Sequence, residues 1–192
     1  DGFGLLNKLI KKSKLVNFNE ESTTALARSL YPMDWLSANV LVNALQRYGQ
    51  NERSLFTFLN DGNRYAIHSF KGKFYAVSQV FDYLINALGS EIYSFNNPHR
   101  AQWQTSFRTL ERIELIEGSD YSLMSTLVKT ICLANIFTKT GSLLDKEILS
   151  KYIHYTSDFN YDAVKLAIEK LERAGVVRFY KHSNKINLLP LQ

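Results

Sequence analysis

The sequence has little of what small cross-linked, loop-rich or membrane proteins need. Its one cysteine, Cys132, excludes a disulfide within the chain and a cysteine-rich zinc site. Only 3 prolines and 9 glycines occur among 192 residues, which disfavours a loop-rich sandwich and favours long helices. No apolar run approaches the roughly 18 residues of a membrane span, and lysines interrupt the stretch 3–16 where a signal peptide would lie. We therefore expect a cytoplasmic protein that does not contact a membrane.

The residues that are present indicate an ordinary globular protein. Hydrophobic residues make up 45% of the chain, charged residues 21% and aromatic residues 13%. The formal net charge is +5, and residues 118–192 hold 10 basic against 7 acidic side chains. This mild excess permits contact with nucleic acid but does not require it. Because the chain begins with Asp1 rather than methionine, we expect it to be a piece of a longer protein.

Helical patterns dominate the first part of the chain, and the turn residues at 118–120 predict a domain boundary. Residues 1–117 are predicted to form a helical domain. Aromatic and β-branched residues near 64–77 predict a short extended segment or hairpin within it. The helices expected in this domain span residues 3–16, 19–31, 34–49, 50–59, 78–88 and 98–116.

The pattern after residue 118 predicts a winged-helix domain over 118–192, so the fold class is mostly α. Asn160 is a good N-cap for the last helix, and Gly175 is placed to end it. Apolar residues of the three helices are expected to share one core, namely Leu127, Ile131, Leu149, Val164, Ile168 and Leu171. Helices at 123–137, 144–153 and 161–174, followed by strands at 176–180 and 186–189, match the order of a helix-turn-helix with a β-hairpin wing.

A search for catalytic and metal-binding motifs fails. The sequence has no G-x-x-x-x-G-K-[ST] phosphate loop and no G-x-G-x-x-G after a strand. Cys132 lies in an apolar stretch and is expected to be a core residue. No metal site is expected, because the histidines stand far apart, at His68, His99, His154 and His182. We therefore expect that the chain is not an enzyme and holds no metal or cofactor by itself.

One run, QNERSLFTFL at 50–59, is polar in its first half and apolar in its second. By spacing alone it is the start of a helix, with Asn51 as its cap and Arg53 as a surface or ion-paired arginine. Together with the stretch LYPM at 30–33, however, the run resembles a segment of large bacterial P-loop ATPases of the AAA+ and STAND kind, many of them defence-associated. Tyr31 departs from the usual Leu-His-Pro-Leu of that segment. Residues 127–137 and 166–180 are similar to the winged helix of the same proteins.

The resemblance implies a role for the chain within a larger ATPase. It would be the lid-like helical region and the winged helix, coupling nucleotide state to partners without hydrolysing ATP. The ATPase core of the same chain would lie upstream and would bind ATP and magnesium. Arg53 matches the arginine of the segment and is the candidate contact to the nucleotide phosphates, with Arg47 on the preceding helix as a second candidate.

A different class of function, a DNA-binding winged-helix regulator with a helical dimerisation or effector region, also fits the pattern. The basic residues that would contact nucleic acid are Arg178, Lys181, His182 and Lys185 of the hairpin and Lys165 of the last helix. However, the last helix mixes acidic with basic residues, and such a face repels phosphate as often as it attracts it. A partner protein is therefore the preferred expectation over DNA. A purely structural scaffold is not separated from the first hypothesis by the sequence.

Overall fold

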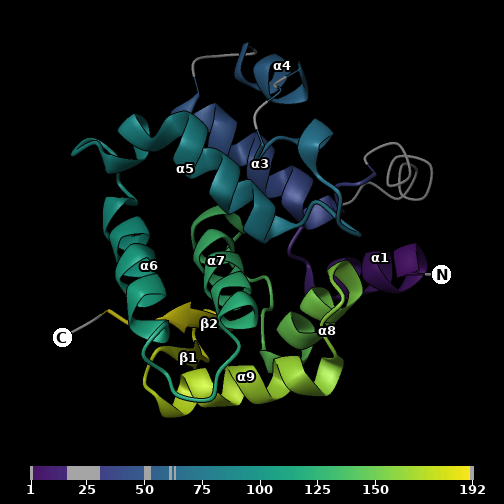
Figure 1. Ribbon diagram of the computed structural model, residues 1–192, viewed down its shortest axis with the longest axis vertical. Helices are drawn as coiled ribbons and strands as arrows, with labels where there is room; N and C mark the ends of the chain where they lie inside the picture. The colour runs from purple at the N-terminus through teal and green to yellow at the C-terminus, as the bar shows by residue number, and fades with distance from the viewer. Residues whose placement is uncertain (1, 17–30, 50–52, 61, 63, 191–192) are drawn as a thin grey trace.

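The computed structural model describes residues 2–16, 31–49, 53–60, 62 and 64–190, and it is mostly helical (Figure 1). This confirms the expected predominance of helix, accompanied by a single small antiparallel sheet in the described part of the chain. The expected helix at 19–31 lies almost wholly outside the described residues. The elements are α1 (Gly2–Ser13), α3 (Trp35–Tyr48), α4 (Arg53–Asn60), the 3-10 turn η2 (Ile67–Ser69), α5 (Val77–Tyr93), α6 (Arg100–Ile113), α7 (Tyr121–Phe137), α8 (Lys146–Thr156), α9 (Tyr161–Arg173), β1 (Val177–Tyr180) and β2 (Lys185–Leu188).

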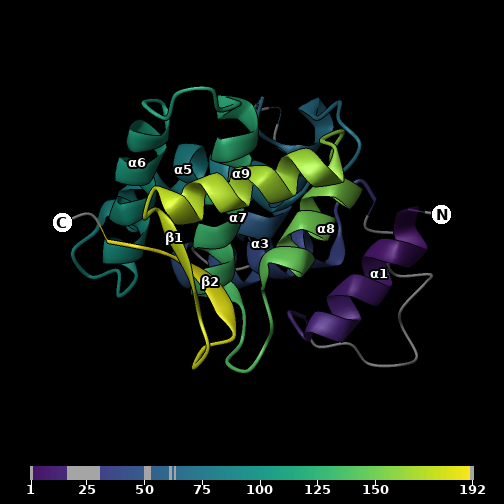
Figure 2. The same cartoon turned by 90° about the horizontal axis from the view of Figure 1, so that it is seen from below.

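Helix α7 lies at the centre of the molecule, with other elements around it (Figures 1 and 2). It contacts α3, α5, α6, α9 and β2. Its sequence explains this position, because a helix that is apolar on nearly all sides is stable only when other elements cover it. The buried side chains of α7 include Leu123, Met124, Leu127, Val128, Ile131, Cys132, Leu133 and Phe137.

The buried side chains before and after residue 118 form one continuous core. Polar contacts also cross this point: the Lys129 ammonium lies 2.7 Å from the Asp82 carboxylate, and the Arg112 guanidinium donates a 2.6 Å hydrogen bond to the carbonyl of Ala174. The boundary expected at 118 stays a prediction. All six residues expected to share the core of the C-terminal helices are buried, with Leu127, Ile131, Leu149, Val164, Ile168 and Leu171 fully enclosed.

The C-terminal helices begin at polar N-cap residues, and α9 ends at a glycine. The Asn160 side chain accepts hydrogen bonds from the first backbone N–H groups of α9. Gly175, with φ +71°, adopts the left-handed conformation that follows a helix end. Helix α8 is shifted from the expected 144–153, because Asp145 caps it and Leu144 pairs with the hairpin instead.

The expected hairpin is present, as β1 and β2 pair antiparallel with Val177 opposite Leu188 and Tyr180 opposite Lys185. Leu144, between α7 and α8, lies along the other edge of β2. Its N–H donates to the Asn184 carbonyl at 2.9 Å, and its own carbonyl accepts from the Ile186 N–H at 2.8 Å. The segment between α7 and α8 therefore joins the hairpin as a single-residue third strand.

Of the two alternatives expected near 64–77, an extended segment or a hairpin, the hairpin is not formed. The segment contains η2, and its one ladder contact is a bridge between Tyr75 and Met33. Aromatic residues that suggested strands pack against other rings instead: Phe70 lies edge-on to the Tyr75 ring at 5.5 Å between centroids, and Phe58 of α4 does so at 5.7 Å. The Tyr75 hydroxyl donates a 2.6 Å hydrogen bond to the carbonyl of Tyr65. Burial of these rings, rather than cross-strand pairing, decides the local conformation.

Two helices of the first part differ from expectation at their ends. Helix α5 begins at Val77 rather than after Ser78, because the Gln79 side chain accepts a hydrogen bond from the Ala76 N–H. It also continues to Tyr93 past a kink at Leu88, where the poor helix formers Gly89 and Ser90 follow. Helix α6 begins two residues after Pro98, because the Asn97 side chain accepts from the N–H of His99 and forms a turn there.

Candidate functional site

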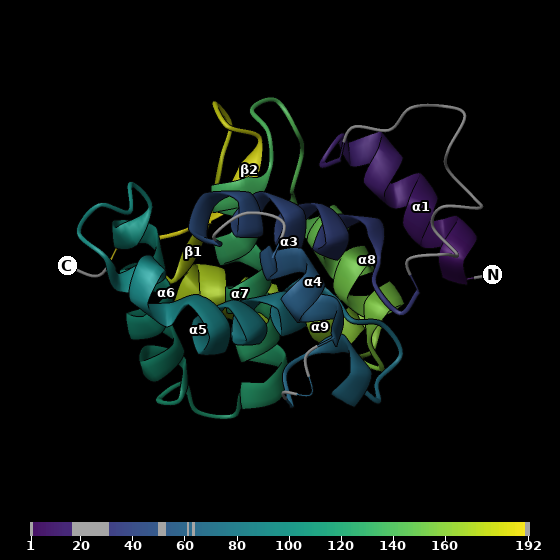
Figure 3. The ribbon, with the colours of Figure 1, turned by 90° about the horizontal axis from the view of Figure 1, so that it is seen from above.

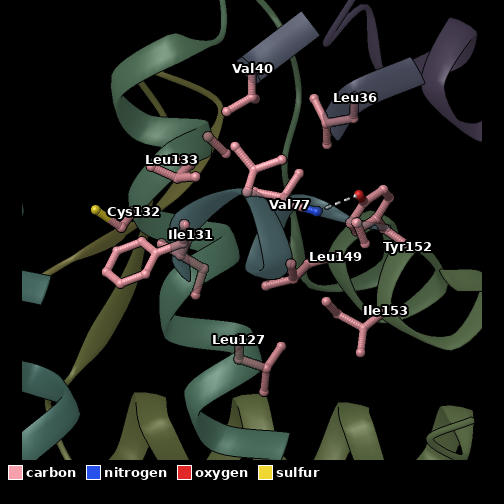
Figure 4. Close-up of a cluster of buried hydrophobic side chains, with 14 of the residues drawn as sticks. Leu36, Val40, Val77, Leu127, Ile131, Cys132, Leu133, Leu149, Tyr152 and Ile153 are labelled. Atoms are coloured by element: carbon pink, nitrogen blue, oxygen red, sulfur yellow. Dashed lines mark hydrogen bonds between the residues drawn. The ribbon is translucent and has the colours of Figure 1, made fainter. Parts of the chain in front are cut away.

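Asp34, at the start of α3, and Tyr152 of α8 together connect three segments of the core by hydrogen bonds. One oxygen, Oδ1, accepts a 2.9 Å hydrogen bond from the Ser37 N–H and caps the helix. The other, Oδ2, accepts a 2.7 Å hydrogen bond from the Tyr152 hydroxyl of α8. That hydroxyl also accepts a 3.2 Å bond from the backbone N–H of Val77, the first residue of α5 (Figure 4). The beginnings of α3 and α5 are thus tied to α8.

Burial determines the ionisation of this pair. It raises the pKa of the Asp34 carboxyl from 3.8 to about 6, against the opposing hydrogen bonds of Ser37 and Tyr152. Burial and, next, the charge of Asp34 raise the pKa of Tyr152 well above 10, so the phenol stays protonated and donates. Both side chains are at most 3% exposed, so they connect elements of the core rather than meet a ligand.

Three of the expected nucleic-acid contacts lie together on the hairpin. Arg178 is exposed on β1, and Lys181 and His182 are exposed in the turn that follows it. The His182 ring lies 5.5 Å from the ring of Tyr180 between centroids. The hairpin therefore exposes three of the basic side chains, and their contact with nucleic acid stays a prediction.

The other two expected contacts are not among these exposed side chains. Lys185 is 7% exposed, and its ammonium donates a 2.8 Å hydrogen bond to the carbonyl of Lys139; burial lowers its pKa. Lys165 lies half-buried on α9, with its ammonium 6.0 Å from the centre of the Tyr161 ring. In the described structure, Lys185 braces the segment between α7 and α8, and Lys165 packs on its own helix.

Helix α9 lies on the side of the molecule that faces the viewer in Figure 2. Its outer face carries charges of both signs around an exposed leucine. Leu166 is 56% exposed, whereas Val164, Ala167, Ile168 and Leu171 turn inward. Glu169 lies 3.3 Å from the Lys146 ammonium of α8, and the Lys170 ammonium donates to the carbonyl of Gly118. The other exposed residues of this face are Asp162, Ala163, Glu172 and Arg173.

Of the two arginines expected to contact a nucleotide, only Arg47 has a side chain that the structure describes. Arg53 is the first residue of α4, and its side chain lies outside the described part of the structure. Arg47 is exposed in the last turn of α3 and lines an open groove of about 740 Å³ between α3 and the end of α7. The pKa of His99 is lowered, first by burial of its ring and second by the positive charge of Arg47. Arg47 therefore stands where an anion could reach it.

The described side chains include one buried thiol and no cluster of metal-ligating groups. Cys132 is 1% exposed, and burial raises the pKa of its thiol to about 12, which leaves it protonated and unreactive. No group of three or more histidine, cysteine, aspartate or glutamate side chains in the described ranges could hold a metal ion. None of the helices in those ranges is both long and apolar enough to cross a membrane.

Sequence reasoning missed two arrangements. The bond between Asp34 and Tyr152 has no local signal, because the two residues are 118 positions apart. The groove between α3 and the end of α7 does have a local signal in the sequence. Polar residues at 39, 43, 46 and 47 recur at the spacing of one helix face, next to the apolar face that packs in the core.

Comparison with known proteins identifies no relative from which a role could be transferred. No protein-family model, curated protein or solved structure matches this chain.

Proposed function

We propose that the chain is a non-catalytic coupling region of a P-loop ATPase and that residues 118–192 form a winged helix that docks on protein. The order of elements supports the winged helix: α7, the bridging Leu144, α8, α9 and the β1–β2 hairpin follow one another as three helices and a wing do. The resemblance of the run 50–59 to ATPases supports the larger context. ATP and magnesium would be bound by the upstream core of the same protein.

The single observation that carries the docking role is the outer face of α9. A helix that reads DNA bases presents Arg, Lys, Asn or Gln toward the major groove. Here the corresponding face presents Asp162, Glu172 and the exposed Leu166. An apolar side chain surrounded by charges of both signs resembles the centre and rim of a protein interface more than a phosphate-binding surface.

The Asp34–Tyr152 bond supports the coupling role. Helix α8 packs against α9, and Tyr152 of α8 holds the first residues of α3 and α5. A force on α9 therefore reaches the helix that carries Arg47 through buried, hydrogen-bonded groups. Such a connection transmits a change only when the joined elements have two arrangements, which nucleotide binding upstream would supply.

The hairpin favours the alternative function, a DNA-binding regulator with a helical dimerisation or effector region. Arg178, Lys181 and His182 are exposed on the same hairpin, and exposed lysines and arginines bind DNA phosphates. If two or three phosphates are contacted, the affinity for DNA would be low. The logarithm of the binding constant would fall with the logarithm of the salt concentration at a slope of about −2 to −3. The alternative predicts weak, non-specific binding by the hairpin rather than base reading by α9.

Substitution of two exposed leucines, one at a time, distinguishes the protein-docking function from the DNA-binding function. Leu166→Glu would add a charge to the docking face of α9 and should lower the ATP turnover of the intact protein. Leu5→Glu, on α1, is the matched control, because Leu5 is similarly exposed at 51% and should leave turnover unchanged. If both variants keep wild-type turnover, or if Leu166→Glu lowers only the affinity for duplex DNA, the docking proposal is wrong.

A further inference from the structure

The connection between α6 and α7, residues 114–120, lies beside the C-terminal half of α9 (Figure 1). Two hydrogen bonds hold it there: the Lys170 ammonium donates at 3.1 Å to the carbonyl of Gly118, and the Arg112 guanidinium donates at 2.6 Å to the carbonyl of Ala174. The connection therefore continues the outer face of α9, and we call the two together the α9–connection surface. This surface lies on the side of the molecule away from α3, α4 and α5, which face the viewer in Figure 3.

Three large apolar side chains are exposed on the α9–connection surface. Leu115 of the connection is 85% exposed, Leu166 of α9 is 56% exposed, and Tyr121 at the start of α7 is 43% exposed. Lys170 lies one turn after Leu166 on the same side of α9, so its bond to Gly118 places Leu166 beside the connection. Exposed apolar side chains that lie together mark sites of protein contact, because a partner that covers them removes apolar area from water.

The exposed charges around these apolar side chains are mostly acidic. The connection contains no basic residue. On α9, one acidic residue is exposed one turn before Leu166, and one basic residue, Arg173, is exposed two turns after it. The exposed acidic residues are Glu114, Glu117 and Asp120 of the connection and Asp162 of α9. The surface is therefore acidic, although the chain as a whole carries a net charge of +5.

The other basic side chains near this surface already bind groups of the chain itself. Lys170 is half-buried and donates to the carbonyl of Gly118, as Arg112 does to that of Ala174. Lys146 of α8 pairs with Glu169 of α9, so the charges of these two side chains compensate each other. The exposed carboxylates of the connection thus decide which ligands the surface attracts.

This charge distinguishes between the possible occupants of the surface. The phosphates of nucleic acids and of anionic lipids would be repelled by the carboxylates. A second copy of the chain packed about a two-fold axis would bring the same acidic side chains together. A protein segment that carries both lysines or arginines and apolar side chains would instead be attracted by the carboxylates and would cover the leucines.

We propose that the α9–connection surface binds a basic amphipathic segment of a partner protein. Apolar side chains of the segment cover Leu115, Tyr121 and Leu166, and its lysines or arginines pair with the acidic side chains around them. The hydrogen bonds that hold the connection against α9 keep the surface ordered before binding, which lowers the entropic cost of association. The inference rests on the proposed docking role of α9 and adds the chemistry of the partner.

The test uses three fluorescein-labelled probes: an amphipathic helical peptide of leucine and lysine, the same peptide with glutamate for lysine, and the same peptide with serine for leucine. Fluorescence anisotropy should show that the leucine–lysine peptide binds the wild-type chain most tightly, and that added salt weakens this binding. Glu114→Lys/Glu117→Lys should bind it about tenfold more weakly or worse. Leu115→Ser/Leu166→Ser should lose affinity to a similar extent and keep the wild-type melting temperature, because both leucines are exposed.

Two matched controls carry equivalent changes outside the surface. Glu91→Lys/Glu147→Lys changes the net charge equally at exposed positions of α5 and α8. Leu5→Ser/Val42→Ser removes two exposed apolar side chains from α1 and α3. Both controls should bind the leucine–lysine peptide as the wild type does. Equal losses in the surface and control variants would overturn the proposal, as would equal or tighter binding of the glutamate or serine peptide, or no binding of any probe.

Failure of this inference differs from failure of the docking role. If Leu166→Glu lowers the ATP turnover of the intact protein but Glu114→Lys/Glu117→Lys binds the leucine–lysine peptide as the wild type does, α9 docks on a partner that is not basic. If the peptide binds as expected but Leu166→Glu keeps wild-type turnover, the surface has the proposed ligand and the docking role in the ATPase is wrong. A wild-type dimer that Leu115→Ser/Leu166→Ser dissociates in sedimentation equilibrium would show that a second copy covers the surface and would overturn the proposal.

Discussion

The Tyr152 hydroxyl donates a 2.7 Å hydrogen bond to the Asp34 carboxylate inside the core, and the two residues lie 118 positions apart in the sequence. Tyr152 belongs to α8, and Asp34 caps α3. A buried carboxylate is costly unless hydrogen bonds compensate its charge. The bond is therefore both a link between the two parts of the chain and a source of pH dependence.

The pH dependence has a definite sign. The pKa of Asp34 is raised from 3.8 to about 6 on folding, so the protonated carboxyl is favoured in the folded state. Its contribution to stability is fully present below about pH 3.8 and is lost as the pH rises through about 6. The expected loss between pH 4 and pH 8 is about 2–3 kcal/mol. We expect it in the wild type but not in Asp34→Asn, and urea unfolding of both proteins at several pH values measures the difference. A constant difference between the two proteins would contradict the prediction.

Removal of the phenol should destabilise the fold and change this titration. Tyr152→Phe leaves the Val77 N–H and one oxygen of Asp34 without their partner, which should cost about 1–3 kcal/mol of unfolding free energy. Because the Tyr152 hydrogen bond lowers the pKa of Asp34 in the folded state, the loss of stability should begin at the same pH in the variant but continue to higher pH. Tyr155→Phe in the same helix is the control and should change neither quantity. A variant as stable as this control would show that the bond is weak.

Part of the fold follows from local signals, and that part was predictable. Asn160 and Gly175 fix the ends of α9 because a side-chain cap and a left-handed glycine act on their own neighbours. The apolar run of α7 and the apolar periodicity of α9 likewise predict the two helices, and the strand-forming residues after Gly175 predict the hairpin. In the candidate site, exposure of Lys181 and His182 agrees with their position at a turn, and Arg178 is exposed on β1.

The parts that sequence reasoning missed depend on distant partners. Tyr75 was expected in a strand, but its ring packs with Phe58 and Phe70. Leu144 was expected in a helix, but hydrogen bonds to the hairpin hold it. Lys185 was expected at the surface, but the carbonyl of Lys139 binds its ammonium group. Local composition does not specify these contacts, because each forms only after elements far apart in the sequence have packed.

The orientation of α9 is tested by two leucines of the same helix. Leu171 is fully buried, so Leu171→Ala should cost about 2–5 kcal/mol of unfolding free energy. Leu166 is 56% exposed, so Leu166→Ala should cost no more than about 0.5 kcal/mol. Denaturant melts of the two variants compare the costs directly. Similar costs would mean that α9 presents a different face to the core.

The proposed role of Arg53 makes a prediction for the intact protein. If Arg53 contacts the nucleotide phosphates as an arginine finger does, Arg53→Ala should lower ATP turnover by about 10³-fold or more without changing the melting temperature. If it only stabilises the start of α4, the substitution should cost about 1 kcal/mol or less and leave turnover unchanged. Turnover and melting temperature of the one variant separate these outcomes, and unchanged turnover would contradict the nucleotide role.

The central claim, that α9 docks on protein in a way that depends on nucleotide, is tested most directly by hydrogen exchange of the intact protein. The backbone amides of 161–173 should exchange more slowly in one nucleotide state than in the other, comparing ADP with a non-hydrolysable ATP analogue. The hairpin amides of 177–188 should be unaffected by nucleotide. Equal exchange of α9 in both states, together with protection of the hairpin by duplex DNA, would contradict the docking role and favour the DNA-binding alternative.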